Sequence, residues 1–164
     1  MKTFHLLGLL LMFGLIFSCS KEKSDGPIPK PNLEKIVGKY QLPTEESVRR
    51  NEKRLWTISK ADDSHVKIVE DLTIDADGKN PKITSRIFDN VTVKEYESGI
   101  TFLRFDGLVL KDSDFTVNGH KNYIIYGNGS VQPNVIHATL HAKDLNSEDV
   151  IPFSNGLLEL IKLD

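Results

Sequence analysis

The chain has 164 residues, of which 39% are hydrophobic and 27% charged, and its formal net charge is −2. This length suits one domain with a sizeable hydrophobic core. The near-neutral charge gives no electrostatic basis for binding nucleic acid. Because Cys19 is the only cysteine, an intramolecular disulfide and a zinc site built on several cysteines are both excluded. We therefore expect packing alone to hold the fold together.

The first 18 residues have the charge and hydropathy pattern of a signal peptide. Lys2 supplies a positive charge, residues 6–17 are almost wholly apolar, and no acidic residue precedes Glu22. The apolar run is shorter than the roughly 20 residues that a membrane-spanning helix needs. Cys19 follows directly, so we interpret it as a lipid attachment point. The alternative is a plain signal peptide or an N-terminal anchor helix in which Cys19 has no special role.

The positions of Ile16, Ser18 and Cys19 make this segment similar to a bacterial lipoprotein signal. The resemblance implies cleavage after Ser18, a thioether-linked diacylglycerol on Cys19, and acylation of the new amine, for example with palmitate. Several acyl chains would anchor the protein durably to a membrane. We therefore predict a lipid-anchored protein of the bacterial cell envelope, at the outer membrane, facing either the periplasm or the cell surface.

Residues 19–32 are predicted to form a flexible tether rich in proline and lysine. The segment has few apolar residues and carries Pro27, Pro29 and Pro31, which favour an extended chain. Its charges at Lys21, Glu22 and Lys23 also allow a sorting signal, because some lipoproteins of the Bacteroidetes type carry charged tracts there. The mixed signs of the charges favour the spacer interpretation.

Residues 33–164 are predicted to form one all-β domain, because apolar and polar residues alternate with period two. We expect about nine strands, near residues 36–42, 53–60, 65–75, 82–89, 91–97, 100–105, 121–127, 134–143 and 157–163. Dipeptides that favour tight turns suggest an antiparallel meander. They are Asp77-Gly78, Ser98-Gly99, Asp106-Gly107, Asn118-Gly119, Asn128-Gly129 and Asn155-Gly156.

A meander of this size exposes two edge strands unless it closes. The apolar segment 157–163 can close it by pairing with residues 36–42. Gly38-Lys39-Tyr40 resembles the Gly-x-Trp start of lipocalin-like barrels, with tyrosine in place of tryptophan, and residues 126–129 are similar to late hairpins of calycin-like lipoproteins of Bacteroidetes. The resemblance implies an up-and-down barrel of about 8–10 strands. A β-sandwich or a half-barrel remains the alternative.

A barrel of this size encloses either a packed core or one small ligand. We expect Tyr40, Trp56, Phe102 and Tyr123 to line the interior, where they would bind a small hydrophobic or amphipathic molecule or simply fill the core. Residues 44–53 break the strand pattern, and we interpret them as a solvated loop rather than a short helical lid.

The sequence offers no convincing catalytic or metal site. His137 and His141 lie on one strand about 13 Å apart, which is too far to share a metal ion. Asp75-Ala76-Asp77-Gly78 fails the calcium-loop pattern at later positions and is better explained as a hairpin turn. We therefore expect no enzymatic activity, no cofactor and no metal. A ligand-binding envelope lipoprotein is the first hypothesis, and an accessory or adaptor protein that binds a protein or glycan partner is the second.

Overall fold

The structure is a computed structural model that describes residues 30–109, 123–144, 150–153 and 156–164. The predicted signal peptide, Cys19 and most of the tether lie outside the described residues. The elements are a 3₁₀ helix η1 (Leu33–Lys35), β1 (Gly38–Gln41), α2 (Thr44–Arg50), β2 (Glu52–Lys60), β3 (His65–Ile74), β4 (Lys82–Glu95), β5 (Thr101–Val109), β6 (Tyr123–Gln132), β7 (Val135–Asp144), β8 (Val150–Pro152) and β9 (Leu158–Lys162).

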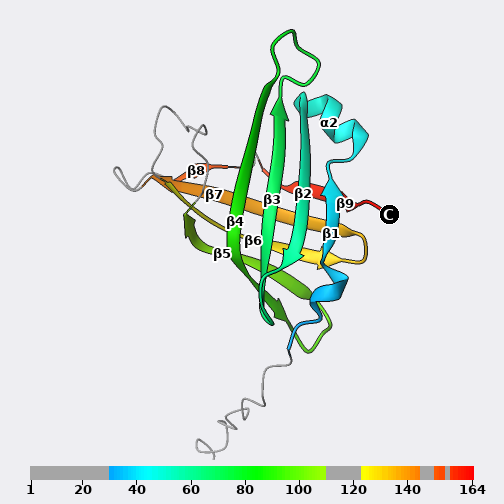
Figure 1. Ribbon diagram of the computed structural model, residues 1–164, viewed down its shortest axis with the longest axis vertical. Helices are drawn as coiled ribbons and strands as arrows, with labels where there is room; N and C mark the ends of the chain where they lie inside the picture. The colour runs from blue at the N-terminus through cyan, green and yellow to red at the C-terminus, as the bar shows by residue number, and fades with distance from the viewer. Residues whose placement is uncertain (1–29, 110–122, 145–149, 154–155) are drawn as a thin grey trace, which may run out of the picture.

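In the described part of the chain, eight antiparallel strands close into an up-and-down barrel (Figure 1). Strands β1 to β7 pair in chain order, and β9 closes the barrel between β7 and β1. The seam pairs Tyr40 with Lys162 and Gln41 with Ile161, which confirms the predicted pairing of the first and last strands. The short strand β8, which the sequence did not predict, pairs with β7 beyond the end of β9. The fold class predicted from the sequence is confirmed.

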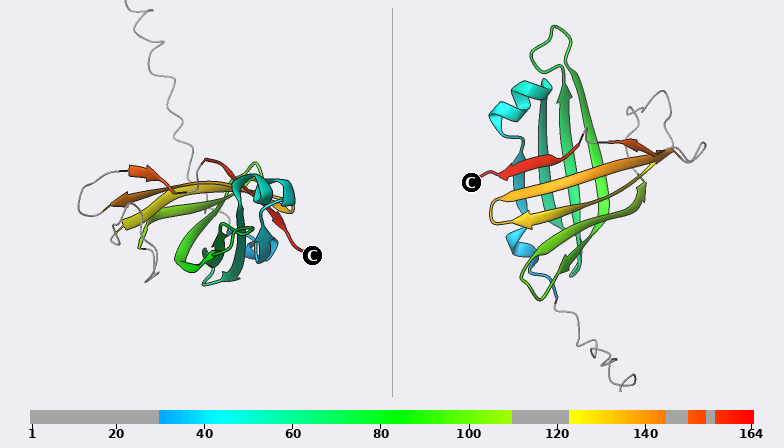
Figure 2. Two further views of the ribbon diagram at one scale, coloured as in Figure 1. Left: turned by 90° about the horizontal axis from the view of Figure 1, so that it is seen from above. Right: turned by 180° about the vertical axis from the view of Figure 1, so that it is seen from behind.

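The two ends of the barrel differ (Figures 1 and 2). At one end, Leu33 of η1 and Ile36, directly after it, pack into the core, and the nearby Lys30 forms an ion pair of 3.2 Å with Asp63 in the β2–β3 turn. We call this the N-terminal end. The opposite end carries α2 and the β3–β4 turn, and we call it the α2 end. Among the described residues, none of the helices has the length and apolarity that crossing a membrane would require.

Alternation along the strands places one face of each strand inside the barrel. The buried apolar side chains come from every strand of the barrel and from η1, and they form one contiguous core. On β2, Trp56 and Ile58 point inward, and on β7 the inward side chains are Ile136, Ala138, Leu140 and Ala142. The predicted alternation of residues 134–143 is thus confirmed.

A detail of the strand prediction is wrong. The predicted strands 82–89 and 91–97 are one strand, β4, in which Asn90 adopts a positive φ of 59° and the inward side chains change parity. Before this point Arg86 and Phe88 point inward, and after it Val91 does. Ile83 is 75% exposed although it is apolar, because the buried positions of this part of β4 are held by the polar residues Thr84 and Arg86.

Two of the expected turn dipeptides lie within strands. Asp106-Gly107 forms a bulge in β5, where the register with β6 shifts. Asn128-Gly129 lies in the middle of β6, so residues 126–129 are not a hairpin. Close strand packing explains the neighbouring glycine, because a Cβ on Gly127 would come within 2.1 Å of the carbonyl oxygen of Thr139. Asp77-Gly78 and Ser98-Gly99 occupy turns as predicted, whereas Asn118-Gly119 and Asn155 lie outside the described residues.

Candidate functional site

The aromatic residues predicted to bind a ligand do not all share one cavity. Tyr40 and Trp56 lie in the barrel interior, and neither has any exposed surface. Phe102 lies on the opposite face of β5 from the buried Leu103 and is only half-buried, so its predicted place in the interior is wrong. Tyr123 begins β6, but its side chain lies outside the described residues. Whether any of these residues binds a ligand stays a prediction.

The interior aromatic rings pack against one another. The ring centroid of Trp56 lies 6.2 Å from that of Phe88 and 6.0 Å from that of Phe105, and the Phe88 and Phe105 rings meet edge to face at 5.6 Å. These separations are typical of stabilising aromatic contacts. The part of the interior around Trp56 is therefore packed as a core.

Nearer the α2 end, four charged side chains of the described residues lie in the interior: Glu52, Arg54, Glu70 and Arg86. We call them the interior ion cluster. Glu70 is fully buried and forms ion pairs with Arg54 and with Arg86, whose Nε lies 2.7 Å from Glu70 Oε2 without hydrogen-bond alignment. The indole N–H of Trp56 donates a 3.0 Å hydrogen bond to Glu70 Oε1. Arg54 also pairs with Glu52 at 3.2 Å.

The cluster is electrically balanced. Burial disfavours the charged form of Glu70, but the guanidinium groups of Arg54 and Arg86 outweigh this effect and hold the pKa of Glu70 below its ordinary value. The strand register brings these side chains together, because Glu70 on β3 lies opposite Trp56 on β2 and opposite Arg86 on β4. The sequence contained a signal that we missed: Glu70 has the same parity as the buried Ile68 and Leu72.

Phe153, in the segment after β8, covers this cluster. Its ring centroid lies 4.4 Å from the Arg86 guanidinium carbon and 6.3 Å from the Phe88 ring, and its backbone N–H donates to the carbonyl of Leu140 at 3.0 Å. A cation over an aromatic face is attracted by the ring quadrupole. The charges of Glu70, Arg54 and Arg86 are thus paired with one another, and Phe153 shields Arg86.

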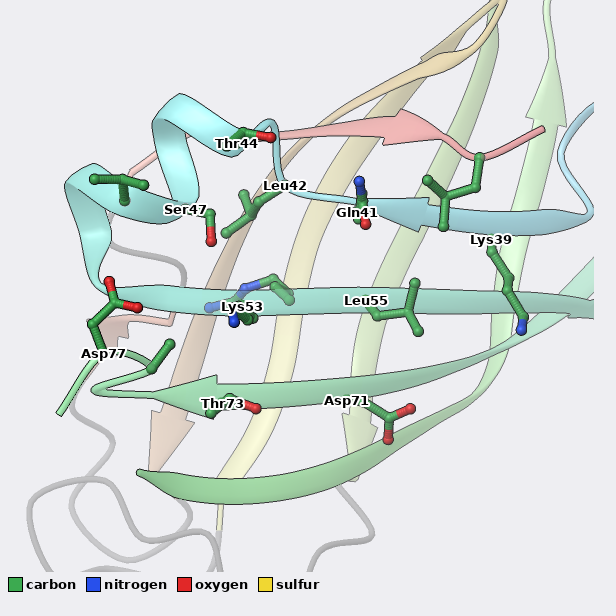
Figure 3. Close-up of a pocket in the computed structure, with 14 residues that line it drawn as sticks. Lys39, Gln41, Leu42, Thr44, Ser47, Lys53, Leu55, Asp71, Thr73 and Asp77 are labelled. Atoms are coloured by element: carbon green, nitrogen blue, oxygen red, sulfur yellow. The ribbon is translucent and has the colours of Figure 1, made fainter. Parts of the chain in front are cut away.

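An open groove lies outside the barrel, between α2 and the outer face of β1, β2 and β3 (Figure 3). Its volume is about 510 Å³, within the usual range of small-molecule sites. We call it the α2 groove. The groove is lined by Lys39, Gln41, Thr44, Ser47, Val48, Lys53, Leu55, Asp71, Thr73, Ala76, Asp77 and Leu163, and it also reaches the buried Leu42 and Arg54.

The helix that forms one wall corrects the prediction of a solvated loop. Glu46 pairs with Arg49 and with Arg50, and these hydrogen bonds lower the pKa of Glu46 to about 2. Asn51 ends the helix in a left-handed conformation, with φ of 50°. Its amide donates a 2.8 Å hydrogen bond to Asp75, and its side-chain oxygen accepts one from the N–H of Asp77. Asn51 therefore connects α2 to the β3–β4 turn, the opposite wall of the groove.

The floor combines apolar and charged groups. Leu55 lies between Gln41 and Asp71 in the strand register, and Lys53 is beside Thr73 in the next row. Val48, on α2, is 67% exposed although it is apolar. Figure 3 shows Lys39 at the end of the groove away from α2.

The charged groups of this floor are available to pair with a bound molecule. Within the described residues, the ammonium groups of Lys39 and Lys53 form no ion pair, nor do the carboxylates of Asp71 and Asp77. Unlike the charges of the interior, they can interact with a bound molecule.

The described residues contain no group of three or more potential metal ligands. His137 and His141 both lie on β7, as predicted, and His137 Nε2 is 3.3 Å from a carboxylate oxygen of Glu159.

No protein-family model matches the chain, and no curated protein or solved structure is significantly similar to it. A function for this barrel therefore has to follow from the geometry of its own residues.

Proposed function

We propose that the protein is a non-enzymatic, lipid-anchored barrel of the bacterial cell envelope that binds a small amphipathic molecule in the α2 groove. The observation that carries the proposal is the exposed Val48 beside a floor in which the apolar Leu55 lies with two lysines that form no ion pair within the described residues. An aliphatic tail would cover Val48 and Leu55. An anionic end would meet Lys39 or Lys53 and stay clear of Asp71 and Asp77.

The groove supports this proposal better than the interior does. Around Trp56 the interior space is taken by aromatic rings, and nearer the α2 end it is taken by the interior ion cluster and Phe153. A ligand inside the barrel would have to displace these side chains. A ligand in the groove displaces only water from surface that is already open.

The course of the chain agrees with an anchor at Cys19. The first described residue, Lys30, lies at the N-terminal end of the barrel, and α2 lies at the other end of the nine-residue strand β2 (Figure 1). Nine residues of strand extend about 30 Å. A tether from the membrane would therefore hold the groove away from the lipid surface and open to solutes of the envelope.

Ligand binding is tested with the chain from Ser20 to Asp164, which lacks the lipid that would compete. Displacement of 1-anilinonaphthalene-8-sulfonate by dodecanoate, followed by native mass spectrometry, should give a saturable one-to-one complex. Val48→Ser should weaken binding about tenfold, equivalent to 1.4 kcal/mol, because the tail loses an apolar contact. Val150→Ser is the matched control, since Val150 is 65% exposed on β8, outside the groove.

The same titration distinguishes the groove from the interior. Trp56 is the only tryptophan and lies inside the barrel, so its fluorescence reports a ligand that enters there. Unchanged Trp56 emission with dye displacement supports the groove. A saturable shift of Trp56 emission that is insensitive to Val48→Ser contradicts it.

The anchor is tested separately. Cys19→Ala should move the protein from the membrane fraction to the soluble fraction and abolish labelling by an alkyne analogue of palmitate, because no thiol remains to form the thioether to diacylglycerol. Persistent membrane association after removal of the signal peptide would contradict the proposed lipid anchor and leave the ligand proposal standing.

A further inference from the structure

A second hollow lies on the outer face of the barrel, at the β4–β5 turn. It has a volume of about 640 Å³ and is lined by Tyr96, Ser98, Phe102, Arg104 and Asn128. We call it the β5–β6 hollow. In the strand order of the closed barrel, β5 and β6 lie across from β1 and β2. The hollow is therefore separate from the α2 groove, and a ligand there is independent of the proposed function.

The hollow presents an aromatic ring that is held in place and exposed. Tyr96 and Phe102 meet edge to face, with ring centroids 5.4 Å apart and an interplanar angle of 85°. Tyr96 is nevertheless 54% exposed. Its backbone is fixed by hydrogen bonds at both ends of the turn, from Tyr96 N–H to Ile100 at 3.0 Å and from Gly99 N–H to Tyr96 at 2.8 Å. The positive φ of 77° at Gly99 makes this turn possible.

Polar side chains lie beside the rings. The register pairs Arg104 with Asn128, so both side chains point outward next to Phe102. A contact of 3.0 Å with Asp106 orients the Arg104 guanidinium. Within the described residues, the Asn128 amide and the Ser98 hydroxyl form no hydrogen bond. Asn128 and Ser98 therefore offer the hollow donors and acceptors that no described residue pairs.

This combination selects among ligand classes. A purely apolar ligand would cover Arg104 and Asn128 without pairing them, which costs free energy. A polyanion would meet Asp106 and a chain of net charge −2. A pyranose ring has an apolar C–H face that stacks on an aromatic ring and a rim of hydroxyl groups that pair with amide, guanidinium and hydroxyl side chains. We propose that the β5–β6 hollow binds a hexopyranose unit of a neutral glycan, with its ring face on Tyr96 and its hydroxyl groups on Arg104 and Asn128.

The test is isothermal titration of the full chain in phospholipid nanodiscs with five neutral oligosaccharides: maltohexaose, cellohexaose, mannohexaose, laminarihexaose and chitohexaose. We expect at least one to bind with a dissociation constant of about 1 mM or lower, and Tyr96→Ala to weaken that binding about tenfold. Tyr126→Ala is the matched control, because Tyr126 is 40% exposed on the outer face of β6 and does not line the hollow.

A second variant tests the proposed hydrogen bonds between the sugar hydroxyl groups and Asn128. Asn128→Ala should weaken the same oligosaccharide several-fold, because a hydroxyl group loses its partner, while the thermal midpoint of unfolding stays close to that of the wild type. The proposal is overturned if none of the five oligosaccharides binds at millimolar concentration, or if Tyr96→Ala and Asn128→Ala bind as the wild type does. Loss of dodecanoate binding would leave this outcome unaffected, because the α2 groove is a different surface.

Discussion

The interior ion cluster and the α2 groove both contain acidic and basic side chains. Those of the cluster are buried and paired, whereas Lys39 and Lys53 of the groove form no ion pair within the described residues. Inside the barrel, Glu70 is fully buried between Arg54 and Arg86. In the groove, Lys39 and Lys53 lie on open surface without an ion pair among the described residues. Charges that neutralise one another in the interior maintain the fold, whereas charges without partners are available to a ligand. Changes to the first set should therefore affect stability, and changes to the second should affect binding.

The largest expected effect is at Glu70. Glu70→Gln removes the shared counter-charge of Arg54 and Arg86, and leaving buried charges without a partner costs about 3–5 kcal/mol. Urea unfolding followed by Trp56 fluorescence measures the loss. Asp71→Asn, one residue further along β3 and exposed in the groove, should leave the free energy of unfolding almost unchanged. Equal losses for the two variants would contradict the distinction between interior and groove.

A similar contrast holds along β5. Phe105→Ala should cost about 3–5 kcal/mol, because Phe105 packs against Trp56 and Phe88 in the core. Phe102→Ala should cost much less, because Phe102 is half-buried on the outer face. Chemical denaturation of both variants checks the difference. If Phe102→Ala proves the more damaging, the face assigned to β5 is wrong.

The pH dependence of stability should also come from the interior. Because the pKa of Glu70 in the folded protein lies below its ordinary value of 4.5, its charge stabilises the fold above that pH. The stabilisation is lost as the pH falls through the lower pKa of the folded state. The free energy of unfolding measured between pH 5 and pH 2 should therefore fall more steeply in the wild type than in Glu70→Gln. Parallel curves for the two proteins would contradict this origin.

A smaller loss of stability than at Glu70 or Phe105 is expected at Asn51, which connects the walls of the groove. Asn51→Gly keeps the left-handed conformation but removes the hydrogen bonds to Asp75 and Asp77. We expect a loss of about 1 kcal/mol in stability and a several-fold loss in dodecanoate affinity, because α2 is no longer held against the β3–β4 turn. Unchanged affinity would show that the groove does not depend on this connection.

The alternation of apolar and polar residues was sufficient to predict an all-β meander because it is a local signal, and the closed barrel followed from the resemblance to lipocalin-like barrels, with a β-sandwich or half-barrel as the alternative. The seam between the first and last strands followed from the apolar character of residues 157–163. The burial of Arg86 could not be predicted in the same way, because it depends on Glu70 in a neighbouring strand.

The groove was missed for a related reason. The helix at residues 44–50 has few apolar residues, and Asn51 anchors it to residues 24 and 26 positions away in the sequence. Such contacts become visible only after the strands are paired. Phe102 was assigned to the interior because β5 has apolar residues on both faces, and the sequence alone does not show which face is inside.

The most direct test of the central claim uses methyl NMR spectra of the chain from Ser20 to Asp164 with a spin-labelled fatty acid, 16-doxyl-stearate. The proposed site predicts paramagnetic broadening of the methyl groups of Val48, Leu55 and Leu163, with Ile58 and Leu103 unaffected. Broadening of Ile58 and Leu103 with little effect on Val48 would place the ligand in the interior and contradict the proposed site.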